Sequence, residues 1–96
     1  MVSLNLIRDH REEILAIARR YGAEDVRIIG SVARGDATEG SDLDLVVRFE
    51  TGRSLFDNGG LLMDLQHLLG VKVDVISEGG LQDRFRENVM KDAVPL

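Results

Sequence analysis

The stretch Asp42-Leu43-Asp44-Leu45-Val46-Val47-Arg48-Phe49 decides the fold, because its apolar run predicts a strand. Two carboxylates stand at the head of that run. Side chains alternate along a strand, so Asp42 and Asp44 are expected to share one face while Leu43 points into the core. Carboxylates are costly to bury unless a positive charge compensates them. Two carboxylates on one face can hold one Mg²⁺ or bridge two such ions. The alternative is a solvated strand end whose acidic residues have no special role.

A second feature, Gly30-Ser31, follows a short β-branched strand over residues 26–29 and opens a helical turn that Gly35 ends. Glycine lets a ligand approach the backbone closely, and N–H groups at a helix start favour phosphate, to which the serine hydroxyl can add a donor. Arg34 is expected on the same side of this turn, where it can contact a triphosphate or pair with Asp36. The alternative is that Gly30 only turns the chain and Ser31 only caps the next helix.

A third carboxylate, Asp74, interrupts the otherwise apolar strand predicted over residues 71–76. An uncompensated carboxylate there would carry a desolvation cost of several kcal/mol, which a neighbouring cation would largely remove. If this strand lies beside residues 43–49, Asp74 can join Asp42 and Asp44 in a triad. The alternative is simple alternation, with Lys72 and Asp74 on the exposed face of the strand.

The order of elements predicts an α/β (α+β) domain, a small mixed sheet of about three to four strands with helices packed against it. Along the chain, the spacing of apolar residues alternates between that of a helix and that of a strand, and glycines separate the segments. One domain is expected over residues 1–96. The predicted elements are a helix over 4–21, a strand over 26–29, a helical turn over 31–35, a strand over 43–49, a loop over 50–60, a helix over 61–69, a strand over 71–76 and a helix over 81–89, the last with a solvated face of Arg84, Arg86 and Lys91.

Composition narrows the classes of function. A formal net charge of −5 argues against direct nucleic-acid binding, which needs a basic surface, but an acidic site can hold polyphosphate through Mg²⁺. The absence of cysteine excludes disulfides and cysteine-based zinc sites. No run of residues approaches the roughly 18–20 apolar residues that span a bilayer, so no membrane association and a cytoplasmic location are expected.

Together, Gly30-Ser31, Arg34-Gly35-Asp36, Ser41-Asp42-Leu43-Asp44-Leu45 and Val73-Asp74-Val75 resemble the minimal nucleotidyltransferases (MNT) of the DNA polymerase beta-like superfamily. The resemblance covers nearly the whole chain. It implies a nucleotidyltransferase fold with a mixed sheet, and a Gly-Ser turn that holds the phosphates of the nucleotide. It also implies that Asp42 and Asp44 bind the divalent metals, and that Asp74 completes the triad and helps to deprotonate an attacking hydroxyl.

Proteins of this size in that family are often antitoxins paired with a HEPN-domain ribonuclease toxin. The resemblance therefore implies transfer of AMP from ATP to a tyrosine of such a partner, with two Mg²⁺ as cofactors and a hetero-oligomer with the partner. A non-catalytic antitoxin that neutralises its partner by complex formation is the alternative. A structural α/β domain with an acidic surface is the third reading, and it predicts no Mg²⁺-dependent nucleotide binding.

Overall fold

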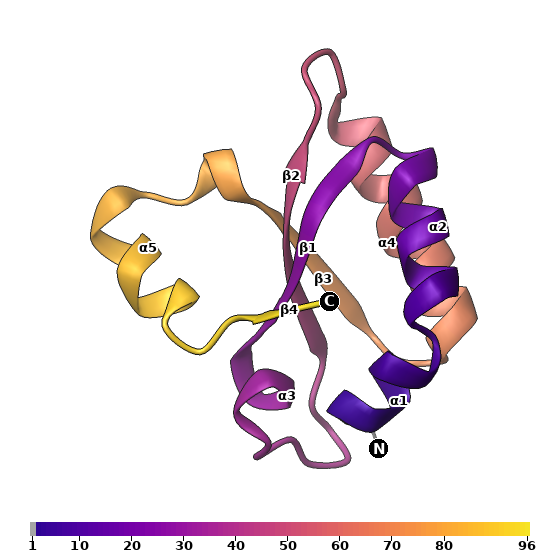
Figure 1. Ribbon diagram of the computed structural model, residues 1–96, viewed down its shortest axis with the longest axis vertical. Coiled ribbons are helices and arrows are strands. Elements are labelled where there is room, and N and C mark those ends of the chain that lie inside the picture. The colour runs from indigo at the N-terminus through magenta and orange to yellow at the C-terminus, as the bar shows by residue number, and fades with distance from the viewer. Residues whose placement is uncertain (1) are drawn as a thin grey trace.

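A mixed four-stranded sheet, with strand order β3-β2-β1-β4, organises the computed structural model, which describes residues 2–96 (Figure 1). None of the helices in this described part is long and apolar enough to cross a membrane. The elements are α1 (Leu4–Asp9), α2 (Arg11–Arg20), β1 (Ala23–Ile29), α3 (Gly30–Arg34), β2 (Leu43–Phe49), α4 (Leu55–Leu69), β3 (Val73–Ser77), the 3₁₀ turn η1 (Glu78–Gly80), α5 (Asp83–Met90) and β4 (Val94–Pro95).

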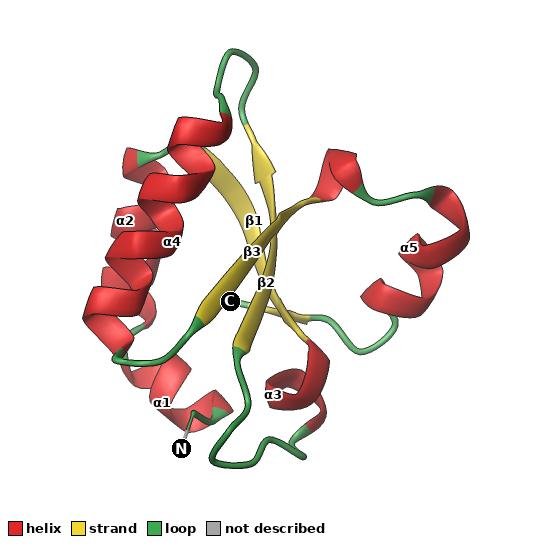
Figure 2. Cartoon of the chain, turned by 180° about the vertical axis from the view of Figure 1, so that it is seen from behind, coloured by secondary structure: helices red, strands yellow, loops and turns green. Residues whose placement is uncertain are grey.

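The sheet combines both strand directions, as the sequence predicted. β1 and β2 are antiparallel, with Ile29 opposite Asp44. β2 and β3 are parallel, with Asp44 opposite Asp74, and α4 makes the crossover between them (Figure 2). β4 was not predicted; Val94 pairs with Ile28 and extends the sheet beyond β1. β1, β2 and β3 therefore carry the sequence features singled out above to one end of the sheet.

The two faces of the sheet are covered very differently (Figures 1 and 2). On one face α2 and α4 pack side by side and bury an apolar core with the strands. On the opposite face α5 lies apart, and none of its residues is fully buried. We call this second side the open face. The core residues under the helices include Ile14, Ala18, Leu43, Leu45, Val47, Leu61, Leu65 and Val73.

Two helices differ from their predicted extents. The helix predicted over 4–21 is divided at His10, whose N–H donates to the carbonyls of both Leu6 and Ile7, a tightened turn that ends α1. α4 begins at Leu55, inside the predicted loop. Ser54 caps it by accepting from the Phe56 N–H, and the Asp57 carboxylate accepts from the Ser54 N–H, which forms a capping box. This local cap stabilises six helical residues that Gly59 and Gly60 disfavour.

Candidate active site

Asp44 and Asp74 lie side by side on the open face. Their strands are parallel neighbours and the two residues are in register, so strand alternation directs both away from α2 and α4. Burial raises the pKa of Asp44, the charges of Asp74 and Asp42 raise it further, and Arg34 acts in the opposite direction. Negative charge is therefore concentrated at this end of the sheet without an equal positive charge beside it.

Asp42 immediately precedes β2, and its charge raises the pKa of Asp44 less than the charge of Asp74 does. Its Oδ2 atom is 3.8 Å from the Nζ atom of Lys72, which is itself exposed. Within residues 2–96, no three acidic, histidine or cysteine groups are arranged closely enough to ligate one ion. The structure thus brings Asp44 and Asp74 together and leaves Asp42 adjacent, in an ion pair with a flexible lysine.

Gly30 forms the wall beside Asp44. Its φ of +73° is a conformation that side chains disfavour, and a Cβ atom at this position would lie 2.8 Å from Asp44 Oδ2. Glycine is therefore required twice, for the turn from β1 into α3 and for the close approach to the carboxylate. Ser31 follows in α3, and the helix ends as predicted at Gly35, with φ of +81°. The predicted phosphate-binding turn and the acidic cluster consequently share one corner of the molecule.

Arg34 is the cation nearest to this corner on α3. Its Nε donates to Asp36 Oδ2 across 3.3 Å, which is the pairing that the sequence left as one of two options. Its charge also acts on Asp44. Since the Arg34–Asp36 pair is exposed, it is worth little and leaves the guanidinium available for a stronger anion.

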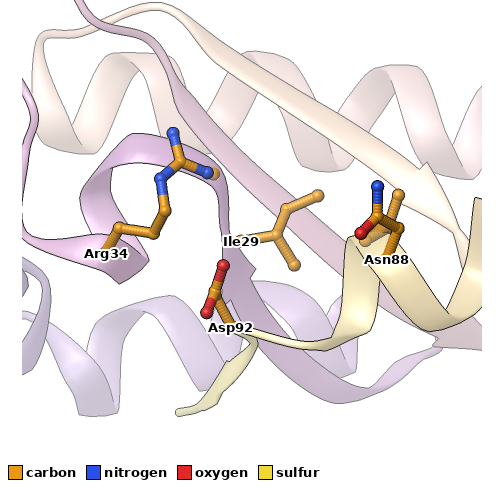
Figure 3. Close-up of a pocket in the computed structure, with 6 residues that line it drawn as sticks. Ile29, Arg34, Asn88 and Asp92 are labelled. Carbon is orange, nitrogen blue, oxygen red and sulfur yellow. The ribbon is translucent and has the colours of Figure 1, made fainter.

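A cavity of about 240 Å³ lies next to Gly30, between α3 and α5. Its lining includes Ile29 and Arg34, from the end of β1 and from α3, and Asn88 and Asp92, from α5 and the turn after it (Figure 3). Sequence reasoning missed the second pair, because residues more than 50 positions away along the chain enter the site only through the tertiary fold. A local signal was absent, since both residues belong to a polar segment that resembles an ordinary solvated helix.

An ion-pair cluster holds α5 over the open face. Glu78 Oε1 lies 2.7 Å from Arg27 Nη1 of β1 and 3.2 Å from Arg86 Nη2 of α5. The hydrogen bond from Arg27 lowers the pKa of Glu78, and the charge of Arg86 lowers it further. Arg86 therefore does more than form the solvated face that the sequence predicted, because it ties α5 to the sheet.

The chain matches the nucleotidyltransferase domain family over residues 10–96. It is 31% identical to the protein adenylyltransferase MntA of Thermococcus cleftensis, covering 94% of this chain and 88% of that protein. It is 32% identical to a Methanocaldococcus jannaschii protein named as a candidate protein adenylyltransferase, covering 92% of this chain and 95% of that protein.

Several solved structures share the fold of this chain. A candidate minimal nucleotidyltransferase superposes with a TM-score of 0.89 at 52% identity, covering 99% of this chain and 97% of that one. A chain of a toxin–antitoxin complex with AMP-PNP shares the fold with a TM-score of 0.75 at 17% identity, covering 88% of this chain and 69% of that one. A chain from the complex of a tri-AMPylated Shewanella oneidensis HEPN toxin with its MNT antitoxin shares the fold with a TM-score of 0.69 at 14% identity, covering 92% and 69%.

The mixed sheet, the registered aspartates and the Gly-Ser turn thus occur in a chain that belongs to the nucleotidyltransferase domain family, among its minimal nucleotidyltransferases, and is an enzyme of nucleotidyl transfer.

Proposed function

We propose that this protein transfers AMP from ATP to a tyrosine hydroxyl of a partner protein, a HEPN-family ribonuclease toxin, and thereby acts as its antitoxin. The observation that carries the proposal is the in-register placement of Asp44 and Asp74 on neighbouring strands, beside the Gly30 turn. Residues 1–96 act in it as one domain. The proposal includes a cytoplasmic location, where the RNA substrate of such a toxin is found, and a hetero-oligomer of enzyme and partner.

The three aspartates are the proposed ligands of two Mg²⁺ ions. Carboxylate oxygens are hard donors of the kind that Mg²⁺ prefers. Proteins usually hold Mg²⁺ through one or two carboxylates together with substrate phosphates. The pKa of Asp44 is raised by burial first and by the charges of Asp74 and Asp42 second, and a divalent cation bound here would offset both. When bound, Mg²⁺ would supply charge neutralisation on the triphosphate and a lowered pKa for the attacking hydroxyl.

The remaining site residues have separate roles in the proposal. The backbone of Gly30 and Ser31 receives the phosphates of ATP, and the guanidinium of Arg34 exchanges its exposed partner Asp36 for them. Asp74 is exposed at the edge strand, where an acceptor hydroxyl can approach from solvent. In this proposal Asp74 completes the metal ligands and accepts the proton that the tyrosine releases.

The relatives named protein adenylyltransferases support a protein as the acceptor. The fold is shared with a chain from a complex that contains an AMPylated HEPN toxin, and with another from a complex that contains AMP-PNP. These likenesses support the choice of an adenine nucleotide and a toxin partner over a small-molecule acceptor.

The test is transfer of labelled AMP to the product of the adjacent gene, with Mg²⁺ and ATP present. We expect the wild-type protein to label the partner and suppress its ribonuclease activity. Asp44→Asn is expected to lower the transfer rate at least about 10³-fold, because it removes a ligand from a site that provides several kcal/mol of charge stabilisation. Asp9→Asn, an exposed aspartate on α1, is the matched control and should transfer normally.

The same assay distinguishes the non-catalytic antitoxin. If the protein suppresses the ribonuclease equally well without ATP, and Asp44→Asn suppresses it as fully as wild type, neutralisation occurs by complex formation. Normal transfer by Asp44→Asn would instead show that the carboxylate assignment is wrong.

A further inference from the structure

We propose that the α5 side of the cavity reads the nucleoside of the bound nucleotide, with Asp92 accepting from a ribose hydroxyl and Asn88 pairing with the adenine edge. This inference rests on the proposed function and deepens it, since it assigns nucleotide specificity to residues outside the catalytic motif. It starts from the position of the cavity, which shares Gly30 with the acidic cluster. A ligand whose phosphates contact the Gly30 turn therefore has an adjoining space of about 240 Å³ available to it.

Charge determines which part of a nucleotide each side of this cavity can accept. Arg34 carries the positive charge on the α3 side, where phosphate is favoured. On the α5 side the carboxylate of Asp92 repels phosphate, so that side is suited to a neutral group that donates hydrogen bonds. A ribose hydroxyl is such a group, and recognition of a ribose hydroxyl by an acidic side chain is a recurrent solution in nucleotide sites.

The order of the side chains follows the order of the groups in a nucleotide. In the view of Figure 3 the labelled side chains follow one another from left to right as Arg34, Asp92, Ile29 and Asn88. A nucleotide laid along this path would present phosphate to Arg34, ribose to Asp92 and base to Asn88. The Asn88 amide can donate one N–H to N7 of adenine and accept, through its oxygen, from the exocyclic amine on the same edge.

Apolar side chains complete a site for a flat ring. Ile29 is nearly buried, with 7% of its surface exposed, and it lines the cavity together with Val89. Guanine presents a carbonyl where adenine presents its amine, so it would leave one polar atom of Asn88 unpaired or opposed. The expected specificity is therefore adenine over guanine and ribose over deoxyribose.

The test is calorimetric titration, in Mg²⁺, with four probes: ATP, GTP, dideoxy-ATP and inorganic tripolyphosphate. For wild type we expect ATP to bind about tenfold or more tightly than GTP. Asn88→Ala is expected to weaken ATP about tenfold, bring it level with GTP and leave tripolyphosphate unchanged. Asp92→Asn is expected to weaken ATP about five- to tenfold while dideoxy-ATP is unaffected. The control, Asp83→Asn, changes an exposed carboxylate on α5 that does not line the cavity.

Two failures are distinguishable. If wild type binds ATP and tripolyphosphate but Asn88→Ala and Asp92→Asn show the wild-type order of affinities, the nucleoside assignment is wrong and the catalytic site stands. If wild type binds neither ATP nor tripolyphosphate, the phosphate site itself is wrong, and both this inference and the proposed function are overturned.

Discussion

The two faces of the sheet differ in what their side chains contribute to stability. Beneath α2 and α4, Leu43 and Leu45 of β2 are almost completely buried, with 0% and 1% of their surfaces exposed. On the open face, Asp44 lies between these two leucines in sequence and stands beside a second carboxylate. The first face provides apolar burial that stabilises the fold, and the second concentrates like charges that oppose it. A single strand therefore supplies both the scaffold and the site.

The helix-covered face should show the largest effect on stability. Leu45→Ala removes a fully buried side chain and leaves a cavity, so we expect the free energy of unfolding to fall by about 2–5 kcal/mol. Denaturant unfolding measures this change. Leu55→Ala is the matched control. Because Leu55 is 87% exposed, this variant should show little change in the free energy of unfolding. Equal losses in the two variants would contradict the assignment of the core to this face.

The Gly30 turn should show the next largest effect. Gly30→Ala places a methyl group at positive φ and against Asp44 Oδ2, so we expect a loss of about 1–3 kcal/mol together with weaker binding of Mg²⁺-ATP. Gly35→Ala meets nothing within 4 Å but has φ of +81°, so it carries the backbone strain without the contact. It should be destabilised less and should bind nucleotide normally. If Gly35→Ala weakens nucleotide binding as much as Gly30→Ala, the close approach to Asp44 has no special importance.

Glu78, unlike Asp44, should behave as a stabilising carboxylate, because two arginines lie beside it. Its pKa is lowered by Arg27 and Arg86, so its contribution is present above its ordinary pKa of 4.5 and is lost as the pH falls through the lowered value. We expect Glu78→Gln to melt below wild type at neutral pH, with the difference vanishing in acid. A difference that persists unchanged below the lowered pKa would show that charge at Glu78 is not the cause.

Ionisation of Asp44 should change the stability of the fold in the opposite direction to that of Glu78, and by the smallest amount. Its pKa is raised, so the stabilising contribution of this group is present below 3.8 and is lost as the pH rises through its folded value. At neutral pH without Mg²⁺, Asp44→Asn is therefore expected to melt slightly above wild type, with the advantage declining in acid. Melting curves recorded from acid to neutral pH check this. A lower melting temperature at neutral pH would mean that the acidic cluster is already compensated within the protein.

Local sequence patterns predicted the strand and the turn that carry the candidate site residues better than they predicted the neighbouring elements. The strand over 43–49 and the turn between Gly30 and Gly35 follow from alternation and from glycine at positive φ, both of which depend on a few adjacent residues. The joining of Asp74 with Asp42 and Asp44 was predicted on the condition that its strand lies beside residues 43–49. The two strands are neighbours and Asp44 lies opposite Asp74, whereas Asp42 pairs with Lys72.

The errors have physical causes. The start of α4 was hidden because Asn58, Gly59 and Gly60 outweighed the Ser54–Asp57 capping box in the interpretation of the sequence. Other features depend on the tertiary fold, which brings Asn88 and Asp92 to Gly30 and Lys72 to Asp42. Spacing along the chain contains no signal for these contacts.

Binding of Mg²⁺-ATP at the end of the open face shared by the Gly30 turn and the aspartates is best tested by amide chemical-shift mapping by NMR during a titration with Mg²⁺-ATP. We expect shifts concentrated in Gly30–Arg34, around Asp42, Asp44 and Asp74, and along the cavity side of α5, with little change in α2. Shifts confined to α2 and α4, or no saturable shifts at all, would contradict it.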